Sequence, residues 1–401
     1  MTVAGIVAEF NPFHKGHEYL IGQARELLGG DCAVVCVMSG SAVQRGEPAA
    51  FSKFARAEAA VSCGADVVLE LPAPWSLSSA EGFARGAVGV LDATGVVDAL
   101  VFGSECGDAG QLTEAAEALL NPETDALIRE ELKAGISYAA ARERALSRVG
   151  ALSECLTTPN DILGVEYVKA LKTLHSVARP LAVRRVGARH DGRGGKEIRS
   201  ASEIRALISE KGALEAMPEA AAAVFSREIT EGRGIVTTEK LEMAMLARLR
   251  MLTESDFAGL PGASEGLDRR LFAAVRSQPG VSEILEYAKS KRYAMSRLRR
   301  MVMCACLGIK AEDQSDSVPY IKVLAMSVEG RAVLHDMRKK ASIPIITKPS
   351  TVRRLDDRSQ RVFAIEAGAT DLASLCYTRL EDRCPDADFT HGPFVCASLM
   401  V

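Results

Sequence analysis

Short apolar runs alternate with helix-like segments along the first 110 residues, and this alternation limits the fold more than any other feature. The apolar runs cover residues 3–9, 33–38, 67–71 and 99–102, and the helix-like segments cover 17–28, 52–62 and 80–91. Strands that are buried on both faces are short, apolar and rich in β-branched residues. The pattern therefore predicts an α/β fold with a parallel sheet and helices on both of its faces.

The later part of the chain has a different character. A further strand is expected at 181–186, followed by a loop with glycines at 192, 194 and 195 and a helix over about 202–211. From 218 to 307 the spacing of apolar residues is helical, and strand signals return only at 343–347. A chain of 401 residues is long for one core. We expect a first domain over 1–212 and a mainly helical second domain over 213–401.

The composition indicates the cellular compartment of the protein and the kinds of partner it has. Its start lacks the basic segment of a signal peptide, and no uncharged apolar run reaches the roughly 18 residues of a membrane span. The cysteines form no C-x-x-C pair, and no carboxylate cluster marks a metal site. We expect a cytoplasmic protein with no membrane partner and no metal held by its own side chains. The formal net charge of −3 is uninformative, but residues 1–120 hold fifteen acidic and six basic side chains, so Lys and Arg are in surplus later.

The segment His14-Lys15-Gly16-His17 follows the first predicted strand and opens the first predicted helix. In an open parallel sheet, ligands bind where strands end and helices begin, and free N–H groups there favour phosphate. Gly16 allows a nucleotide to approach the backbone, and the two imidazoles can donate hydrogen bonds to phosphate oxygens. We predict that His14 and His17 are catalytic. The alternative is a pair of histidines that cap the helix or bind a metal.

Three more segments are expected at the same edge of the sheet. Arg45 lies in the loop after the second strand and can neutralise a phosphate or a carboxylate, although a solvated surface arginine fits as well. Gly103 follows the fourth strand and allows close packing of a ribose or base. Asn160 either reads the nucleotide or caps a helix.

A basic segment precedes the helix expected near residue 202. Eight Lys or Arg and three acidic residues lie between Arg179 and Arg205. Ser202 starts the helix, so its hydroxyl can hydrogen-bond a phosphate, with Arg205 one turn further on. The two helix N-termini would then enclose a triphosphate, which predicts catalytic roles for Ser202 and Arg205. A plain helix cap with surface arginines is the alternative.

A basic ridge is expected in the second domain. Projected on a helix, Leu298, Met301, Val302 and Ala305 share one side and the basic residues lie on or beside the other. We predict that this ridge binds a row of phosphates, with a steep salt dependence; a solvated helix face is the alternative. Its members are Lys289, Lys291, Arg292, Arg297, Arg299 and Arg300.

Taken together, these motifs resemble the tRNA(Met) cytidine acetate ligases, a branch of the HxGH nucleotidyltransferase-like superfamily. The likeness runs through Glu9-Phe10-Asn11-Pro12-Phe13-His14, Gln44-Arg45-Gly46-Glu47-Pro48, Phe102-Gly103-Ser104-Glu105 and Ser200–Arg205. Asn-Phe is common in the family where this chain has Ser41-Ala42, and Ser202 replaces a threonine but keeps the hydroxyl. The resemblance implies a Rossmann-like HxGH nucleotidyltransferase domain followed by a mainly helical, tRNA-binding domain.

The resemblance also implies an activity. Acetate and ATP would give acetyladenylate and pyrophosphate, and the acetyl group would pass to N4 of the wobble cytidine in elongator tRNA(Met). Mg²⁺ would arrive on the ATP phosphates. By motif, the ATP contacts would be Val7, Ala8, Glu9, Phe10, Asn11, Pro12, Phe13, His14, Lys15, Gly16, His17, Glu18, Tyr19, Leu20, Gly103, Asn160 and Arg185.

Two other functions fit parts of the sequence. A metabolite adenylyltransferase would use the same nucleotide motif, but it has no need of the helical second domain with its basic ridge. A non-catalytic RNA-binding protein would use the ridge but has no need of intact His14, Gly16, His17 and Arg205. The sequence gives no indication of the oligomeric state.

Overall fold

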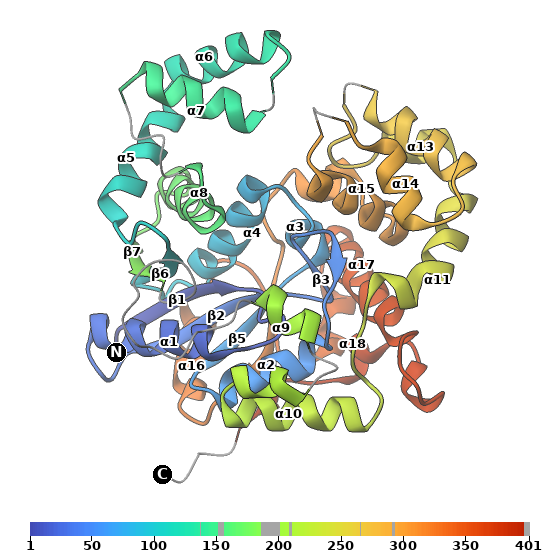
Figure 1. Cartoon of the computed structure of the whole chain (residues 1–401). Helices are drawn as coiled ribbons and strands as arrows, with labels where there is room; N and C mark the ends of the chain where they lie inside the picture. Colours follow the sequence, from blue (N-terminus) through green and yellow to red (C-terminus); the bar gives the residue numbers. More distant parts are fainter. Residues whose placement is uncertain are drawn as a thin grey trace.

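The centre of the molecule is a mixed sheet of mostly parallel strands (Figure 1). The computed structural model describes residues 1–136, 138–150, 156–185, 201–207, 211–264, 266–290 and 293–396. Within them, five parallel strands stand in the order β5-β2-β1-β6-β7. They are β1 (Val3–Ala8), β2 (Ala33–Ser39), β5 (Val67–Leu71), β6 (Ala99–Ser104) and β7 (Arg179–Arg184). The order reverses direction between β1 and β6, so a ligand is expected at the carboxyl ends of these two strands.

Both faces of the sheet are covered because the central strands are apolar along their whole length. Every residue of β2 and β5 is buried. Helices α4 and α8 join the core on one face, and α1, α2 and α10 join the core on the other, as Figure 1 shows. The bounds are α1 (Lys15–Leu28), α2 (Lys53–Ser62), α3 (Ala73–Ser76), α4 (Ala80–Ala93), α5 (Ala109–Leu120), α6 (Pro122–Lys133), α7 (Tyr138–Arg148), α8 (Pro159–Thr173), α9 (Ala201–Leu207) and α10 (Glu219–Thr230).

The predicted strands and helices are confirmed to within a few residues, and the expected parallel sheet is present. Strand β5 has the predicted bounds, whereas α1 begins at Lys15 rather than near His17 because His14 caps it. The glycine-rich loop, residue 186 and residues 208–210 of the predicted helix lie outside the described residues.

The expectation that strand signals return only at 343–347 was wrong. Strand β8 (Ile321–Met326) pairs antiparallel with β5 in the main sheet, and β9 (Ile345–Ile346) and β10 (Phe394–Val395) pair with β8. All six residues of β8 are buried, including Lys322. The division of the chain after residue 212 stays a prediction, and the sheet takes strands from both sides of it.

A helical lobe packs beside the sheet (Figure 1, right). Its core is formed by α11, α12, α13, α14 and α15 together with one face of α17, and it includes Ala42 and Leu77 from the first part of the chain. The bounds of the remaining helices are α11 (Thr238–Met251), α12 (Glu254–Ala258), α13 (Leu267–Ser277), α14 (Val281–Ala288), α15 (Met295–Leu307), α16 (Gly330–Lys340), α17 (Asp357–Ser374) and α18 (Ala387–Thr390). The predicted apolar side of α15 is confirmed, because Leu298, Met301, Val302 and Ala305 are buried.

A short hairpin joins the sheet to this lobe. Strands β3 (Ala42–Val43) and β4 (Glu47–Pro48) enclose Gly46, whose φ of 79° is in the left-handed region. A Cβ on Gly46 would overlap the backbone of Arg299 and Arg300 in α15. The hairpin can therefore approach α15 this closely only with glycine at that position.

We expect Gly46→Ala to lower the free energy of unfolding by more than about 1 kcal/mol, because the new side chain meets both a strained φ and a backbone contact. Gly89→Ala in α4 is the matched control, since a Cβ there has no atom within 4 Å. In a helix interior that change stabilises by about 0.5–1 kcal/mol. Denaturant unfolding of both variants tests this. Equal effects would show that the hairpin contact adds no stability.

Candidate nucleotide site

His14 and His17 form the opening turn of α1, directly after the loop that leaves β1. The Nδ1 atom of His14 accepts the Gly16 N–H at 3.0 Å, and Nδ1 of His17 accepts the His14 N–H at 3.2 Å. The two rings stack with centroids 3.8 Å apart. Helix capping, the alternative to catalysis considered for these histidines, is thus present. It uses only one nitrogen of each ring.

These hydrogen bonds determine the tautomers. A backbone N–H can only donate, so each Nδ1 is an acceptor and a neutral ring carries its proton on Nε2. Burial, with smaller contributions from the nearby Arg185 and Arg205, lowers the pKa of His14 to about 4. Burial also holds the pKa of His17 well below its ordinary value, with contributions from His14 and Arg185. Each ring is therefore a neutral Nε2–H donor at pH 7, and within the described residues neither Nε2 has a protein partner.

The depressed pKa predicts a stability loss in acid. The unfolded chain binds a proton at His14 near pH 6.5 and the folded chain only near pH 4, so the stabilisation is complete above pH 6.5 and lost as the pH falls toward 4. We expect His14 to account for about 2 kcal/mol of unfolding free energy lost between pH 7.5 and pH 5. Urea unfolding of wild type and His14→Gln at both pH values measures it. The exposed His175→Gln serves as control, and identical pH dependence in all three proteins would contradict the assignment.

The loop of residues 9–13, here called the histidine loop, joins β1 to the first turn of α1. The β3–β4 hairpin and α9 both contact this loop. The Gln44 N–H donates to Glu9 Oε1 at 2.7 Å, and Arg45 NH1 donates to Ser202 Oγ at 3.0 Å. Arg205 donates to the Asn11 carbonyl at 2.8 Å and to Ser202 Oγ at 3.3 Å. Ser202 Oγ thus accepts from two arginines, which places both guanidinium groups beside the histidine loop.

The turn after β6 supplies the third wall. Asp161 Oδ1 accepts the Glu105 N–H at 2.9 Å, and Asn160 Nδ2 donates to Glu105 Oε1 at 2.6 Å. Asn160 is not the cap of α8, because that position is Thr158. A Cβ on Gly103 would come 3.3 Å from Arg185 Cγ. Gly103 therefore leaves room for Arg185, whose guanidinium also lies 3.9 Å from Glu105.

The structure thus brings the predicted residues together from β1, α1, the hairpin, β6, β7 and α9. Val7 and Ala8 end β1, Glu9–Phe13 form the loop, and Lys15–Leu20 open α1, with Lys15, Glu18 and Tyr19 exposed. Sequence reasoning missed three buried groups that organise this edge, which are Arg56, Asp161 and Glu366. Only Asp161 had a sequence signal, as the neighbour of Asn160 at a predicted helix start.

The projection of the ridge on a single helix was wrong for its first part, because Lys289 caps the end of α14 and α15 begins only at Met295. The ridge residues that the structure describes contact other parts of the protein. Arg299 pairs with Glu47 at 2.7 Å, and Arg300 donates to the Gln44 carbonyl at 3.3 Å, so both reach the hairpin. Arg297 donates to the Gly262 carbonyl, and Lys289 donates to the Tyr293 carbonyl. Lys291 and Arg292 lie outside the described residues.

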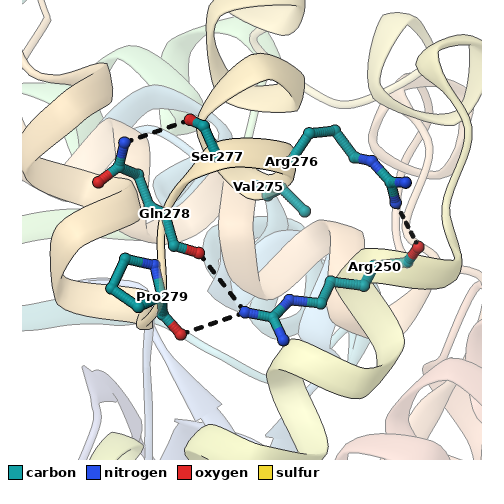
Figure 2. A pocket seen from close by; sticks show the side chains of 6 residues that line it. All are labelled: Arg250, Val275, Arg276, Ser277, Gln278 and Pro279. Carbon is teal, nitrogen blue, oxygen red and sulfur yellow. Dashed lines mark hydrogen bonds between the residues drawn. The ribbon is translucent and has the colours of Figure 1, made fainter.

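A shallow hollow in the helical lobe is separate from this site (Figure 2). Arg250 at its rim donates to the Pro279 carbonyl at 3.2 Å, and Arg276 donates to the Arg250 carbonyl at 3.0 Å. Val275, Ser277 and Gln278 complete the lining. Both arginines are used to join the ends of α11 and α13, and the hollow contains none of the predicted site residues.

Two kinds of feature are absent from the part of the chain that the structure describes. No three His, Cys, Asp or Glu side chains are grouped so that they could hold a metal ion. No helix combines the length and the apolar character that crossing a bilayer requires.

Neutral imidazole donors and arginines meet at the switch point of the parallel sheet, an arrangement that suits a phosphate-bearing ligand and is typical of nucleotide-binding proteins. Consistently, the model of a family described as HIGH Nucleotidyl Transferase matches residues 1–388. Curated relatives show which family within this class the chain resembles. A tRNA(Met) cytidine acetate ligase of Acetivibrio thermocellus is 36% identical over 98% of this chain and 99% of its own length. One of Fervidobacterium nodosum is 40% identical over 91% of this chain and 88% of its own. The chain belongs to the tRNA(Met) cytidine acetate ligase family.

Two solved structures are similar to this chain over nearly its full length. A crystal structure of Thermotoga maritima TmcAL bound with alpha-thio ATP is 37% identical, covers 99% of this chain and 100% of its own, and has a TM-score of 0.91. The apo form of the same protein gives a TM-score of 0.92. The Rossmann-like nucleotidyltransferase fold expected from the sequence is confirmed.

Proposed function

We propose that the chain is an ATP-dependent ligase that forms N4-acetylcytidine at the wobble position of elongator tRNA(Met), using acetate. One observation carries the proposal. Two imidazoles, each neutral and presenting Nε2–H, lie beside Arg45, Arg185 and Arg205 at the switch point of a chain whose full-length relatives carry this name. A site of this composition suits the transfer of an adenylyl group.

In the first step, a carboxylate oxygen of acetate attacks the α-phosphorus of ATP. An O–P bond forms, the bond to the β-phosphate bridge breaks, and pyrophosphate leaves with the electron pair. Negative charge grows on the phosphate oxygens as this happens. The Nε2–H groups of His14 and His17 and the Arg205 guanidinium supply preorganised donors for that charge, and one such donor contributes on the order of 3 kcal/mol to a transition state.

In the second step, the N4 amine of cytosine attacks the carbonyl carbon of acetyladenylate. A C–N bond forms, AMP leaves with the electron pair of the C–O bond, and the amine loses a proton. The amine is a weak nucleophile because its lone pair is delocalised into the ring. The acyl group must therefore be activated first, which is the reason for the use of ATP.

The ATP phosphates would carry Mg²⁺ into the site. Oxygen ligands at close to octahedral geometry suit this ion, and it commonly binds through substrate phosphates and water. Glu9 lies in the histidine loop and Glu105 in the turn after β6, and each carboxylate already accepts a backbone or side-chain N–H. The basic residues of α15 would hold the tRNA backbone.

The decisive test is mass spectrometry of tRNA nucleosides after incubation with ATP and isotope-labelled acetate. Labelled N4-acetylcytidine in elongator tRNA(Met) is the expected product. Exchange of labelled pyrophosphate into ATP separates the main alternative. Exchange that requires acetate supports the ligase, whereas exchange that ignores acetate would indicate a metabolite adenylyltransferase instead.

A further inference from the structure

Arg56 of α2 is fully buried and joins two loops of the site through their carbonyl groups. Its NH1 donates to the Glu9 carbonyl at 2.7 Å and to the Ser39 carbonyl at 3.0 Å, and its NH2 donates to the Gly40 carbonyl. Glu9 begins the histidine loop, and Ser39 and Gly40 begin the loop that carries Arg45. One planar guanidinium therefore contacts both loops where they leave β1 and β2.

Glu366 of α17 holds the second of these loops from the opposite direction. Its Oε1 accepts the Ser41 N–H at 2.8 Å, and its Oε2 accepts the Ala73 N–H at 2.7 Å. A Cβ on Gly40 would overlap the Glu366 carboxylate, so a larger residue at this position would displace that carboxylate. The carboxylate belongs to a helix near the C-terminus, yet besides its ion pair with Lys53 it accepts backbone N–H groups just after β2 and β5.

Further contacts link the loop bases held by Arg56 and Glu366 to the predicted site residues. Beyond Ser41 the chain forms the hairpin, where the Gln44 N–H donates to the Glu9 side chain and Arg45 reaches Ser202. Arg45 can keep its place relative to the histidines only if the bases of both loops keep theirs. Arg56 binds the bases of both loops, and Glu366 binds the base of the loop that carries Arg45.

Stability alone is a poor explanation for so many buried charges. Lys53 Nζ lies 3.0 Å from Glu366, 2.6 Å from Glu70 and 2.6 Å from Asp388, with all four side chains at most 1% exposed. Lys322 completes the group through Glu70 and Asp388. Apolar residues of similar volume commonly replace such networks with no loss of stability. Directed charge-assisted hydrogen bonds, by contrast, impose a geometry that apolar contacts cannot.

We propose that Arg56 and Glu366 are positioning residues for adenylyl transfer. They hold the histidine loop and the loop that carries Arg45 in one fixed arrangement. The proposal rests on the proposed function for its reaction. It assigns α17, near the C-terminus, a role in a site whose other residues all come from the first 205 positions. The role acts through backbone position, without contact to substrate.

Arg56→Lys and Glu366→Gln test this. Lysine keeps the charge but cannot contact the three carbonyls together, and glutamine keeps the shape of Glu366 while replacing one acceptor oxygen by a donor. Glu166→Gln is the matched control, because Glu166 is buried and paired with Arg142 and Lys169 away from both loops. Amide hydrogen exchange and the kinetics of acetate-dependent pyrophosphate exchange are measured at a temperature where all four proteins are folded.

We expect faster amide exchange over residues 39–48 in both variants and over 9–13 in Arg56→Lys, with neither change in Glu166→Gln. We expect kcat to fall about tenfold or more while the dissociation constant of an ATP analogue changes less than threefold, because misplacement of about 1 Å costs catalysis far more than binding. Unchanged loop exchange, or a kcat that matches the Glu166→Gln control, would overturn the proposal. If Arg56→Lys does not fold, Glu366→Gln decides alone. Wild type without acetate-dependent exchange would refute the proposed function, while the amide-exchange comparison would still decide the positioning role.

Discussion

His17→Ala should lower kcat for acetyladenylate formation by about 10²–10³-fold, the usual cost of removing one preorganised donor to a developing negative charge. The structure explains why the loss falls on kcat. His17 is neutral, its Nδ1 is occupied by the His14 N–H, and its Nε2–H is left for the ligand. The hydrogen bond from such a donor becomes stronger when the phosphate oxygens gain negative charge, which happens in the transition state.

Single-turnover formation of labelled acetyladenylate measures this effect without the RNA step. tRNA affinity should stay within about twofold, since α15 lies on the helical lobe. His175→Ala, an exposed histidine just after α8, is the matched control and should leave kcat unchanged. Full RNA acetylation by His17→Ala would contradict the catalytic assignment of the histidine pair.

The double change Arg299→Ala and Arg300→Ala should weaken tRNA binding about a hundredfold or more, because each hydrogen bond to a charged group contributes a net of about 1.5–3 kcal/mol and about 1.4 kcal/mol is tenfold in affinity. If each arginine neutralises one phosphate, the slope of log affinity against log salt should fall by about 2. Filter binding or fluorescence anisotropy of elongator tRNA(Met) over a salt series measures both quantities.

The hairpin contacts require a control for this prediction. Arg299 also pairs with Glu47, and Arg300 also donates to the Gln44 carbonyl, so the double variant can disturb the Arg45 loop as well. Glu47→Gln removes the ion pair and leaves both arginines in place. We expect it to preserve tRNA affinity or raise it, because Arg299 is released. Equal loss of tRNA binding in Glu47→Gln would show that the arginines act by supporting the hairpin.

Much of the parallel sheet and the helices near it could be predicted from local sequence. Strand β5 has its predicted bounds, β1, β2 and β6 differ from theirs by one or two residues, and the buried side of α15 was identified. These features follow from the period of apolar residues and from helix and strand end signals, which are local. The histidine motif was recognisable for the same reason, since strand, loop, glycine and helix are consecutive.

Two features could not be found in this way. Strand β8 is short, carries Lys322 as its second residue, and follows a long helical stretch, so it was not predicted. Strand β8 pairs with β5 because both faces of β8 are buried at that position in the sheet. Lys322 is tolerated there because Glu70 and Asp388, from distant parts of the chain, neutralise it.

The sequence by itself determined the parallel strands, the place of the histidine motif between β1 and α1, and the family of the chain. Only the tertiary structure decided that Arg56 and Glu366 are buried at the bases of the two loops. In a sequence, a charged residue on a helix looks like a solvent-exposed one, because the cost of its burial is met by partners that are far away along the chain. Glu366 accepts the N–H of Ser41, 325 positions earlier, and no local pattern can encode that contact.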